Sequence, residues 1–186
     1  MGVTTDTRAR MITSAALLLR EHGVAGTSIP KVLAHSNGPR GSVGHHFPGG
    51  RAELITEALT WAGTLVTDAL TKKRARGASP AEVFSFICDF YAKQLTSTDY
   101  AAGCPVGAAA QEAFDDPVIG PVITRIIDSW TTTLTDALKD AGRDANEASE
   151  LALQCVCSLE GGILVARVQR STKPIDTVRT RILPLL

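Results

Sequence analysis

The chain has 186 residues, of which 44% are hydrophobic and 20% are charged. This length and composition are typical of an ordinary globular protein with a buried core, and they exclude a disordered or low-complexity chain. The net charge is zero, but residues 1–76 carry ten Lys and Arg against five Asp and Glu, and residues 77–186 carry nine against fourteen. We therefore expect any contact with a polyanion to be made by the N-terminal part.

The start of the chain resembles an export signal only superficially. Arg8 and Arg10 precede an apolar run, but Thr13 and Ser14 interrupt it and no small-residue cleavage site follows. We interpret this segment as an amphipathic helix of a cytoplasmic protein, and we expect no membrane span because no apolar run approaches the required length. Four cysteines without paired spacing predict buried thiols rather than a disulfide scaffold: Cys88, Cys104, Cys155 and Cys157.

Three helices are predicted at the N-terminus. The first spans about Thr5–His22, has apolar residues at helical spacing, and ends at Gly23 as a natural C-cap. The second has Thr27 or Ser28 as N-cap and stops near residues 37–38, where Asn-Gly tolerates left-handed backbone. The third, "PRGSVGHHF", is very short. Two short helices joined by a tight turn are the layout of a helix-turn-helix.

Six further helices are predicted in the remainder of the chain. Their apolar stripes lie at about 51–76, 80–97, 108–114, 117–141, 145–170 and 174–183. No segment has the alternation of a strand or the turn of a hairpin. The fold class predicted is all-α with about nine helices, in which residues 1–50 form a helix-turn-helix domain and residues 51–186 a second helical domain, linked by the helix from about 51 to 76.

The stretch "TSIPKVLAHSNGPRGSVGHHFPGGRAELI" resembles the helix-turn-helix of the TetR family of transcriptional regulators. The match covers Ile12 to about Ala58, including "AALLLREHG" in the first helix. The start "PRGS" of the third helix, "HHFPGG", and "GCPVGAAAQEAF" downstream are similar to the LmrA/YxaF branch. The resemblance implies a homodimeric repressor, released from a pseudo-palindromic DNA operator by a hydrophobic small molecule.

The resemblance also implies where DNA is contacted. The third helix enters the major groove, and Arg40 is its long cationic side chain, suited to a base edge such as guanine. Ser42 and His45 are further candidates on this helix, and Gly41 permits close approach to DNA. His46 and Arg51 fall where the family contacts phosphates. The full predicted DNA-binding set is Thr27, Ser28, Lys31, Pro39, Arg40, Gly41, Ser42, His45, His46 and Arg51.

One position departs from the family pattern. Gly44 stands where the family usually has an aromatic residue, commonly tyrosine. A glycine there removes a phosphate anchor and weakens a helix that is already short. We therefore expect binding that is weaker or more salt-sensitive, or a third helix that orders fully only on DNA.

The resemblance places a ligand pocket in the second helical domain. Apolar residues at helical spacing are usually plain core, so each candidate has that alternative. An apolar lining favours a hydrophobic ligand, with an aromatic one as an option. The candidates are Trp61, Phe84, Cys88, Tyr91, Phe114, Trp130 and Leu134.

Two glycines interrupt the helix predicted over residues 145–170. Gly161 and Gly162 cost helix stability unless close helix packing offsets it. This is consistent with the family's dimer interface, a four-helix bundle made by the last two helices of each subunit, whereas the alternative is a kink inside a monomer. The predicted interface residues are Leu159, Gly161, Gly162, Ile163, Val178 and Ile182.

Two other classes of function are alternatives to a DNA-binding regulator. An enzyme or metal protein would have to use adjacent His45 and His46, the cysteines, or Asp115 with Asp116, and none of these has the spacing of a known catalytic or metal motif. The sequence therefore predicts no catalytic residue, metal or cofactor. A binding protein that has lost DNA recognition is the second alternative, and Gly44 is the feature that favours it.

Overall fold

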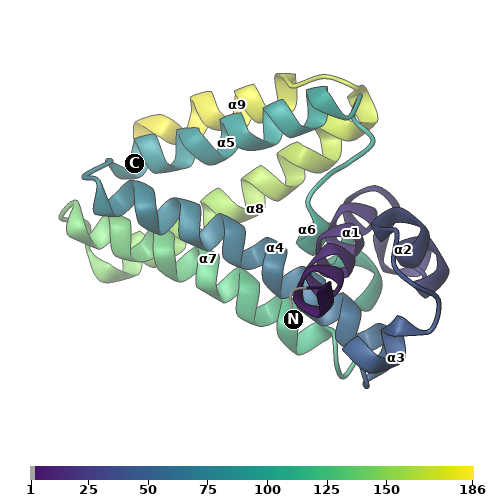
Figure 1. The fold of residues 1–186 in the computed structure, drawn as a ribbon. Coiled ribbons are helices and arrows are strands. Elements are labelled where there is room, and N and C mark those ends of the chain that lie inside the picture. The colour runs from purple at the N-terminus through teal and green to yellow at the C-terminus, as the bar shows by residue number, and fades with distance from the viewer. Residues whose placement is uncertain (1–2) are drawn as a thin grey trace. The chain divides into compact units, whose positions relative to one another are not determined.

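The computed structural model describes residues 3–186, and within them it contains helices and no strand. Figure 1 shows the helices in chain order. The helical prediction is confirmed in the described part of the chain. The helices are α1 (Val3–Gly26), α2 (Ile29–Ser36), α3 (Ser42–His46), α4 (Gly50–Ala75), α5 (Pro80–Ser97), α6 (Pro105–Ala113), α7 (Gly120–Asp140), α8 (Ala145–Gln169) and α9 (Lys173–Ile182), followed by a short 3-10 turn, Leu183–Leu185.

The chain divides into two compact units. The first comprises the described residues up to Gly63 together with Pro105–Thr124, and the second comprises Thr64–Cys104 and Arg125–Leu186. The sequence placed a boundary at residue 50, before the long helix, whereas α4 and α7 each begin in the first unit and end in the second. The reason that α6 belongs to the first unit is its extensive packing against α1.

Gly23, the residue at which the sequence predicted the end of the first helix, is a kink inside α1. Gly23 has φ of 67° and interrupts the helix, although helical turns continue to Gly26. A side chain here would also meet Glu112 of α6, because a Cβ built on Gly23 lies 1.8 Å from Glu112 Oε1. Glycine suits this position because it adopts the positive φ without strain and has no Cβ to meet the Glu112 carboxyl group.

The turn between α2 and α3 follows local rules. Ser28 is the N-cap of α2, and Pro30 occupies its first turn, where a missing N–H has no cost. Asn37 ends the helix with a left-handed φ of 52°, and its N–H donates to Leu33 O. Gly41, with φ of 86°, is the N-cap of α3. The helix-turn-helix geometry therefore arises from a capping serine and two left-handed residues.

Arg8 fastens α1 to α3 and α4 within the first unit. Its Nε donates to His46 O at 3.3 Å, its guanidinium forms an ion pair with Glu57, and its Cζ lies 5.0 Å from the centre of the Phe47 ring. Phe47 is fully buried. These contacts engage the Arg8 cation within the first unit.

The second unit is a bundle of α5, α8 and α9 with the C-terminal parts of α4 and α7. Ser79 and Glu82 form a reciprocal capping box at the start of α5. Asp144 caps α8 by accepting from the N–H groups of Asn146 and Glu147, and these bonds lower the pKa of its carboxyl. Both caps satisfy backbone donors that would otherwise have no partner in the helix.

Close packing of α8 against α9 explains one of the two mid-helix glycines. A Cβ on Gly162 would lie 3.2 Å from Val178 Cγ2 and 3.7 Å from Ile175 Cα, so a larger residue would push α9 away. Gly161, by contrast, is exposed, and a Cβ there would meet nothing within 4 Å. Only Gly162 is therefore required for packing within the protomer.

By length and composition alone, α8 could cross a membrane. Its inner side, however, packs in the bundle, where Ala148, Ala152, Cys155 and Ala166 are completely buried. Such an apolar helix is typical of the core of a helical protein, so this observation is weak support for a membrane span.

Candidate functional site

The short helix α3 has one buried and one exposed side. Val43 in α3 and Phe47, the residue after the helix, are buried and fix α3 against the rest of the first unit. The opposite side and the preceding turn carry the residues predicted to approach DNA. Those exposed on it are Pro39, Arg40, Gly41, Gly44 and His45, whereas Ser42 and His46 are partly exposed.

Arg40 lies in the turn immediately before α3, and its side chain is exposed. Among the described residues, its guanidinium forms no hydrogen bond or ion pair with another side chain. Ser42 differs because its hydroxyl donates to Pro39 O at 2.7 Å and so stabilises the first turn of α3. Of these two, Arg40 is the side chain whose donors are available to an external acceptor.

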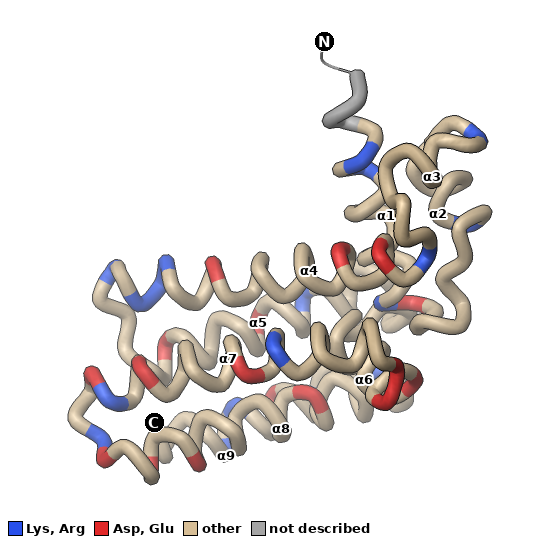
Figure 2. Tube along the Cα trace, turned by 90° about the horizontal axis from the view of Figure 1, so that it is seen from below, with Lys and Arg blue, Asp and Glu red and all other residues tan. Residues whose placement is uncertain are grey.

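The charge around α2 and α3 has a single sign. From Val24 to Ala52 the sequence has three basic residues, Lys31, Arg40 and Arg51, and no acidic one. Figure 2 accordingly shows blue but no red positions on α2, α3 and the turn that joins them. A surface of this kind attracts a polyanion such as the phosphate backbone of DNA.

The residues at the start of α2 have distinct local roles. Thr27 is buried, and its hydroxyl donates to Gly23 O at 2.7 Å, so it holds the turn between α1 and α2. Ser28 is the cap of α2 and accepts from the N–H of Lys31 at 3.5 Å. The ammonium of Lys31 donates to Gly26 O at 2.9 Å, and the side chain is exposed. Ser28 and Lys31 therefore lie at the surface, and Thr27 does not.

Arg51 is partly buried at the start of α4. Its Nε donates to Thr27 O at 3.0 Å, and another of its nitrogens donates to Val24 O. The guanidinium therefore holds the backbone of the α1–α2 turn, a contact that sequence reasoning did not anticipate. His46 remains partly exposed, with its ring 5.1 Å from that of His45.

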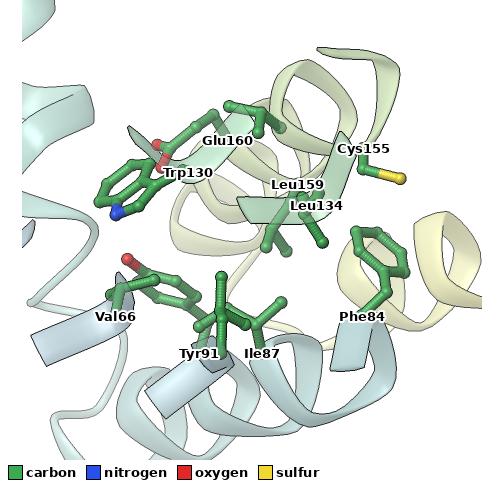
Figure 3. Close-up of a pocket in the computed structure, with 11 residues that line it drawn as sticks. Val66, Phe84, Ile87, Tyr91, Trp130, Leu134, Cys155, Leu159 and Glu160 are labelled. Carbon is green, nitrogen blue, oxygen red and sulfur yellow. The ribbon is translucent and has the colours of Figure 1, made fainter. Parts of the chain in front are cut away.

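A pocket lies within the second unit. Its cavity volume is about 30 Å³, well below the usual range for small-molecule pockets. Figure 3 shows the side chains that surround it. They are Val66, Leu70, Phe84, Ile87, Tyr91, Trp130, Leu134, Cys155, Val156, Leu159 and Glu160.

Four of the predicted ligand-binding residues line this pocket: Phe84, Tyr91, Trp130 and Leu134. The other three, Trp61, Cys88 and Phe114, are absent from its lining. Cys88 is buried elsewhere in the second unit, whereas Trp61 and Phe114 belong to the first unit, where the Phe114 side chain is 72% exposed. Helical spacing identifies apolar faces but does not indicate which of them line the same space.

The pocket also contains a carboxyl group that the sequence reasoning missed. Glu160 lies in the pocket wall on α8, and burial raises the pKa of its carboxyl although a hydrogen bond from Cys104 opposes the rise. Tyr91 donates its hydroxyl hydrogen to Cys104 Sγ at 3.4 Å. In the sequence, Glu160 is the lone acidic residue of the otherwise apolar run "CSLEGGILV", and this pattern could have identified it.

The four cysteines are free thiols, and three of them are buried. Cys88, Cys104 and Cys155 are buried, as predicted, whereas Cys157 is exposed. Burial raises the pKa of Cys88 and that of Cys155 to about 12. Neither thiol therefore has the thiolate character that a nucleophile needs.

The residues predicted for a dimer interface divide between two sides of α8 and α9. Leu159, Gly162, Ile163 and Ile182 are buried within one protomer, Val178 is partly buried, and Gly161 is exposed. The outward side of α8 carries a separate set of apolar side chains. Its exposed members are Leu153, Leu164, Val165 and Val168. We call this set, with Gly161, the outer α8 face.

Comparisons with known proteins identify the family. A family model described as "Transcriptional regulator LmrA/YxaF-like, C-terminal domain" matches residues 80–181. An uncharacterized HTH-type transcriptional regulator of Mycobacterium tuberculosis is 41% identical over 96% of this chain and 93% of that protein. The HTH-type transcriptional regulator LmrA of Bacillus subtilis is 24% identical over 97% of each chain.

Solved structures share the fold. A TetR-family transcriptional regulator from Agrobacterium tumefaciens superimposes with a TM-score of 0.85 over 98% of both chains at 15% identity. One from Legionella pneumophila gives 0.83 at 22% identity over 93% of both chains. These regulators are not enzymes, and among the described residues no group of His, Cys, Asp and Glu could hold a metal ion. The chain belongs to the TetR family of helix-turn-helix transcriptional regulators, in its LmrA/YxaF-like branch.

Proposed function

We propose that the protein is a dimeric repressor that a small molecule releases from its DNA operator. The observation that carries the DNA part is the exposed side of α3 with the turn before it. In that turn Arg40 lacks a partner among the described side chains, and the charged residues of the surrounding segment are all basic. Arg40 reads a base edge in the major groove, most favourably guanine, whose O6 and N7 accept two hydrogen bonds. His45 and Ser42 flank it.

Phosphate contacts surround this reading helix in the proposed complex. Ser28 and Lys31 lie at the surface at the start of α2, where backbone N–H groups and the helix dipole favour an anion. His46 contributes from the end of α3. Arg51 acts partly by holding the α1–α2 turn through its bonds to Val24 and Thr27, so its loss disturbs the position of α2 as well as any phosphate contact.

The dimer forms through the outer α8 face. An exposed apolar set that includes Leu164 and Val168 on one long helix is typical of an interaction surface. Gly161 lies among these side chains with open space above it, which allows a second helix to approach closely. A two-fold axis at this interface places the two α3 helices of the dimer about 34 Å apart, or a multiple of that distance. The operator must therefore be pseudo-palindromic.

Ligand binding is linked to DNA binding through chain connectivity. Helix α4 begins shortly after α3 and supplies Val66 and Leu70 to the pocket. Cys104, which holds Tyr91 and Glu160 by hydrogen bonds, directly precedes α6. A ligand that shifts either element favours a different position of the DNA-binding helices and lowers operator affinity. Such a repressor acts in the cytoplasm.

Paired substitutions test the DNA part. Arg40→Ala is expected to relax discrimination at one base pair, with a cost of about 1–3 kcal/mol for the preferred sequence. Lys31→Ala is expected to weaken binding to all sequences alike and to reduce the slope of affinity against salt. Gel shifts on a specific operator and on scrambled DNA measure both. Equal losses on the two DNAs for Arg40→Ala would contradict its proposed role in reading sequence.

A further inference from the structure

We propose that residues 98–104, the segment between α5 and α6, form a lid over one end of the pocket. Arg167 of α8 holds this lid closed, and an effector enters only when the lid opens. The inference rests on the proposed ligand-regulated function and names the element that controls access to that site. Three observations support it: the small volume of the pocket, the contacts of the lid with two residues of the pocket wall, and the contacts that hold the lid on α8.

The pocket is too small for an effector in the conformation of the structure. Its cavity of about 30 Å³ has room for a water molecule but not for an organic compound. Part of the wall must therefore move before a ligand can bind. The residues that line the pocket belong to α4, α5, α7 and α8, whose backbones are fixed by regular hydrogen bonds. A non-helical segment beside this wall can move at a lower cost than any of these helices.

The lid contacts the polar end of the pocket through Cys104. The Tyr91 hydroxyl donates to Cys104 Sγ at 3.4 Å, and the Cys104 thiol bonds to the Glu160 carboxyl. Figure 3 shows the oxygen atoms of Tyr91 and Glu160 on the same side of the pocket as the Trp130 indole. Cys104 itself is buried. Movement of the lid away from α8 therefore separates Cys104 from these two side chains and uncovers that end of the pocket.

Arg167 holds the lid on α8. It follows Glu160 by about two helical turns and so lies on the same face of the helix. Its Nη2 donates to Ala101 O at 2.6 Å. Its stem runs close to the backbone of Gly103, where a Cβ would lie 2.8 Å from Arg167 Cδ. The side chain therefore contacts the lid through both a hydrogen bond and close packing, and the packing requires a glycine at position 103.

The outer end of the lid is exposed, and its backbone is strained. Asp99 and Tyr100 have φ of 50° and 62°, a left-handed conformation that residues other than glycine rarely adopt. Arg170 forms an ion pair with Asp99 at 2.5 Å, and its guanidinium lies 5.9 Å from the centre of the Tyr100 ring. This ion pair adds little stability, because the two side chains are 60% and 81% exposed. The closed position of the lid therefore depends mainly on Arg167 and Cys104.

Alkylation by iodoacetamide tests the lid in the full-length protein, without effector or DNA. Mass spectrometry of peptides measures the labelling rate of each thiol. The rate at Cys104 reports lid opening, whereas the rate at Cys88, buried in the bundle outside the pocket lining, reports opening of the whole bundle. Arg167→Met keeps an aliphatic stem and removes the donor, so it is expected to raise the Cys104 rate several-fold and leave the Cys88 rate unchanged. Arg181→Met, at an exposed arginine of α9, is the matched control and is expected to label as the wild type does.

Gly103→Ala supplies a second variant that acts from the lid side of the same contact. Its methyl group meets the Arg167 stem, so it is expected to raise the Cys104 rate as well. In Arg167→Ala the atoms that this methyl group would meet are absent. Adding Gly103→Ala to Arg167→Ala is therefore expected to raise the Cys104 rate no further, which is the non-additivity of two residues in contact.

Other results would overturn the inference. An unchanged Cys104 rate in Arg167→Met, an equal rise at Cys88, or additive effects of Gly103→Ala and Arg167→Ala would each do so. A gel shift of the wild type with DNA from upstream of its own coding sequence separates the lid from the proposed function. If the labelling follows the expected pattern and no DNA is bound, the lid stands and the repressor function fails. If DNA is bound and the labelling pattern is absent, the repressor function stands and the lid fails.

Discussion

Glu112 on α6 accepts a hydrogen bond from the backbone N–H of Ala25 at 2.7 Å, at the point where the chain passes from α1 to α2. The same carboxyl group lies against Gly23, whose left-handed backbone ends the regular part of α1. The α1–α2 turn is therefore held by α6 on one side and by Arg51 of α4 on the other. Each contact connects the position of α2 to a neighbouring helix.

Glu112→Ala is expected to loosen this turn. Loss of an exposed, charge-assisted hydrogen bond should lower the free energy of unfolding by about 1 kcal/mol and weaken operator binding several-fold, because α2 is less well positioned. Thermal unfolding and a gel shift measure the two effects. Glu112→Gln retains an acceptor oxygen and is expected to lie close to the wild type. If Glu112→Ala binds the operator with wild-type affinity, the contact does not position α2.

Gly44 is expected to accept a side chain. It is exposed, and a Cβ built on it meets nothing within 4 Å. Gly44→Ala should therefore stabilise α3 by about 0.5–1 kcal/mol through backbone entropy alone. Gly44→Tyr should add the phosphate anchor that the family pattern has here and bind the operator more tightly than Gly44→Ala.

Gel shifts of the two Gly44 variants separate helix stability from phosphate contact. Equal operator affinities for Gly44→Ala and Gly44→Tyr would indicate that the family's aromatic anchor does not act in this protein. A lower affinity of Gly44→Tyr than of the wild type would indicate that the glycine is needed for close approach.

Glu160→Gln is expected to raise the melting temperature of the ligand-free protein at neutral pH. Because burial raises the pKa of Glu160 above its unfolded value, the folded state binds the proton more tightly, and stability decreases as pH rises from the unfolded pKa through the raised one. A glutamine at this position does not ionise, so its burial has no such cost at neutral pH. The melting temperatures of the two proteins should converge at a pH below the unfolded pKa of glutamate, where both side chains are neutral. A difference that does not depend on pH would contradict a buried, titrating carboxyl group.

Val168→Glu should produce monomers. Val168 is 79% exposed on the outer α8 face, and a charge there is left unpaired and desolvated in a dimer. Light scattering coupled to size-exclusion chromatography measures the mass. Val118→Glu, also at an exposed valine but outside α8, is the matched control and should leave the dimer intact. A dimeric Val168→Glu protein would place the interface elsewhere.

Local sequence rules predicted most element boundaries because their causes are local. Ser28, Gly23 and Ser79 act within one helical turn of the ends that they define. The start of α6 was predicted three residues late, at Ala108, because Pro105 opens the helix and Gly107 is tolerated inside it. Asp116 accepts backbone N–H bonds from Val118 and Ile119 and so caps the turn that precedes α7, which begins at Gly120 rather than at the predicted residue 117.

Contacts between residues that are distant in sequence were harder to predict than helix boundaries. Arg51 was predicted to contact phosphates, since no local rule shows that the carbonyls of Val24 and Thr27 lie beside it. The ion pair of Arg8 with Glu57 was not predicted for the same reason. Periodicity found apolar faces of α8 but did not separate the side that packs in the protomer from the outer α8 face. For the same reason Glu160 was overlooked: its role depends on Tyr91 and Cys104, which are distant in sequence.

The central claim is that the exposed side of α3 binds DNA. Its most direct test is a gel-shift titration of the full-length protein with DNA from upstream of its own coding sequence, at two salt concentrations and with scrambled competitor DNA. We expect a shifted complex at low salt that resists the competitor and weakens steeply as salt rises. The complex should be lost in Arg40→Ala, while circular dichroism shows a retained helical fold. The absence of any shift at low salt would contradict it.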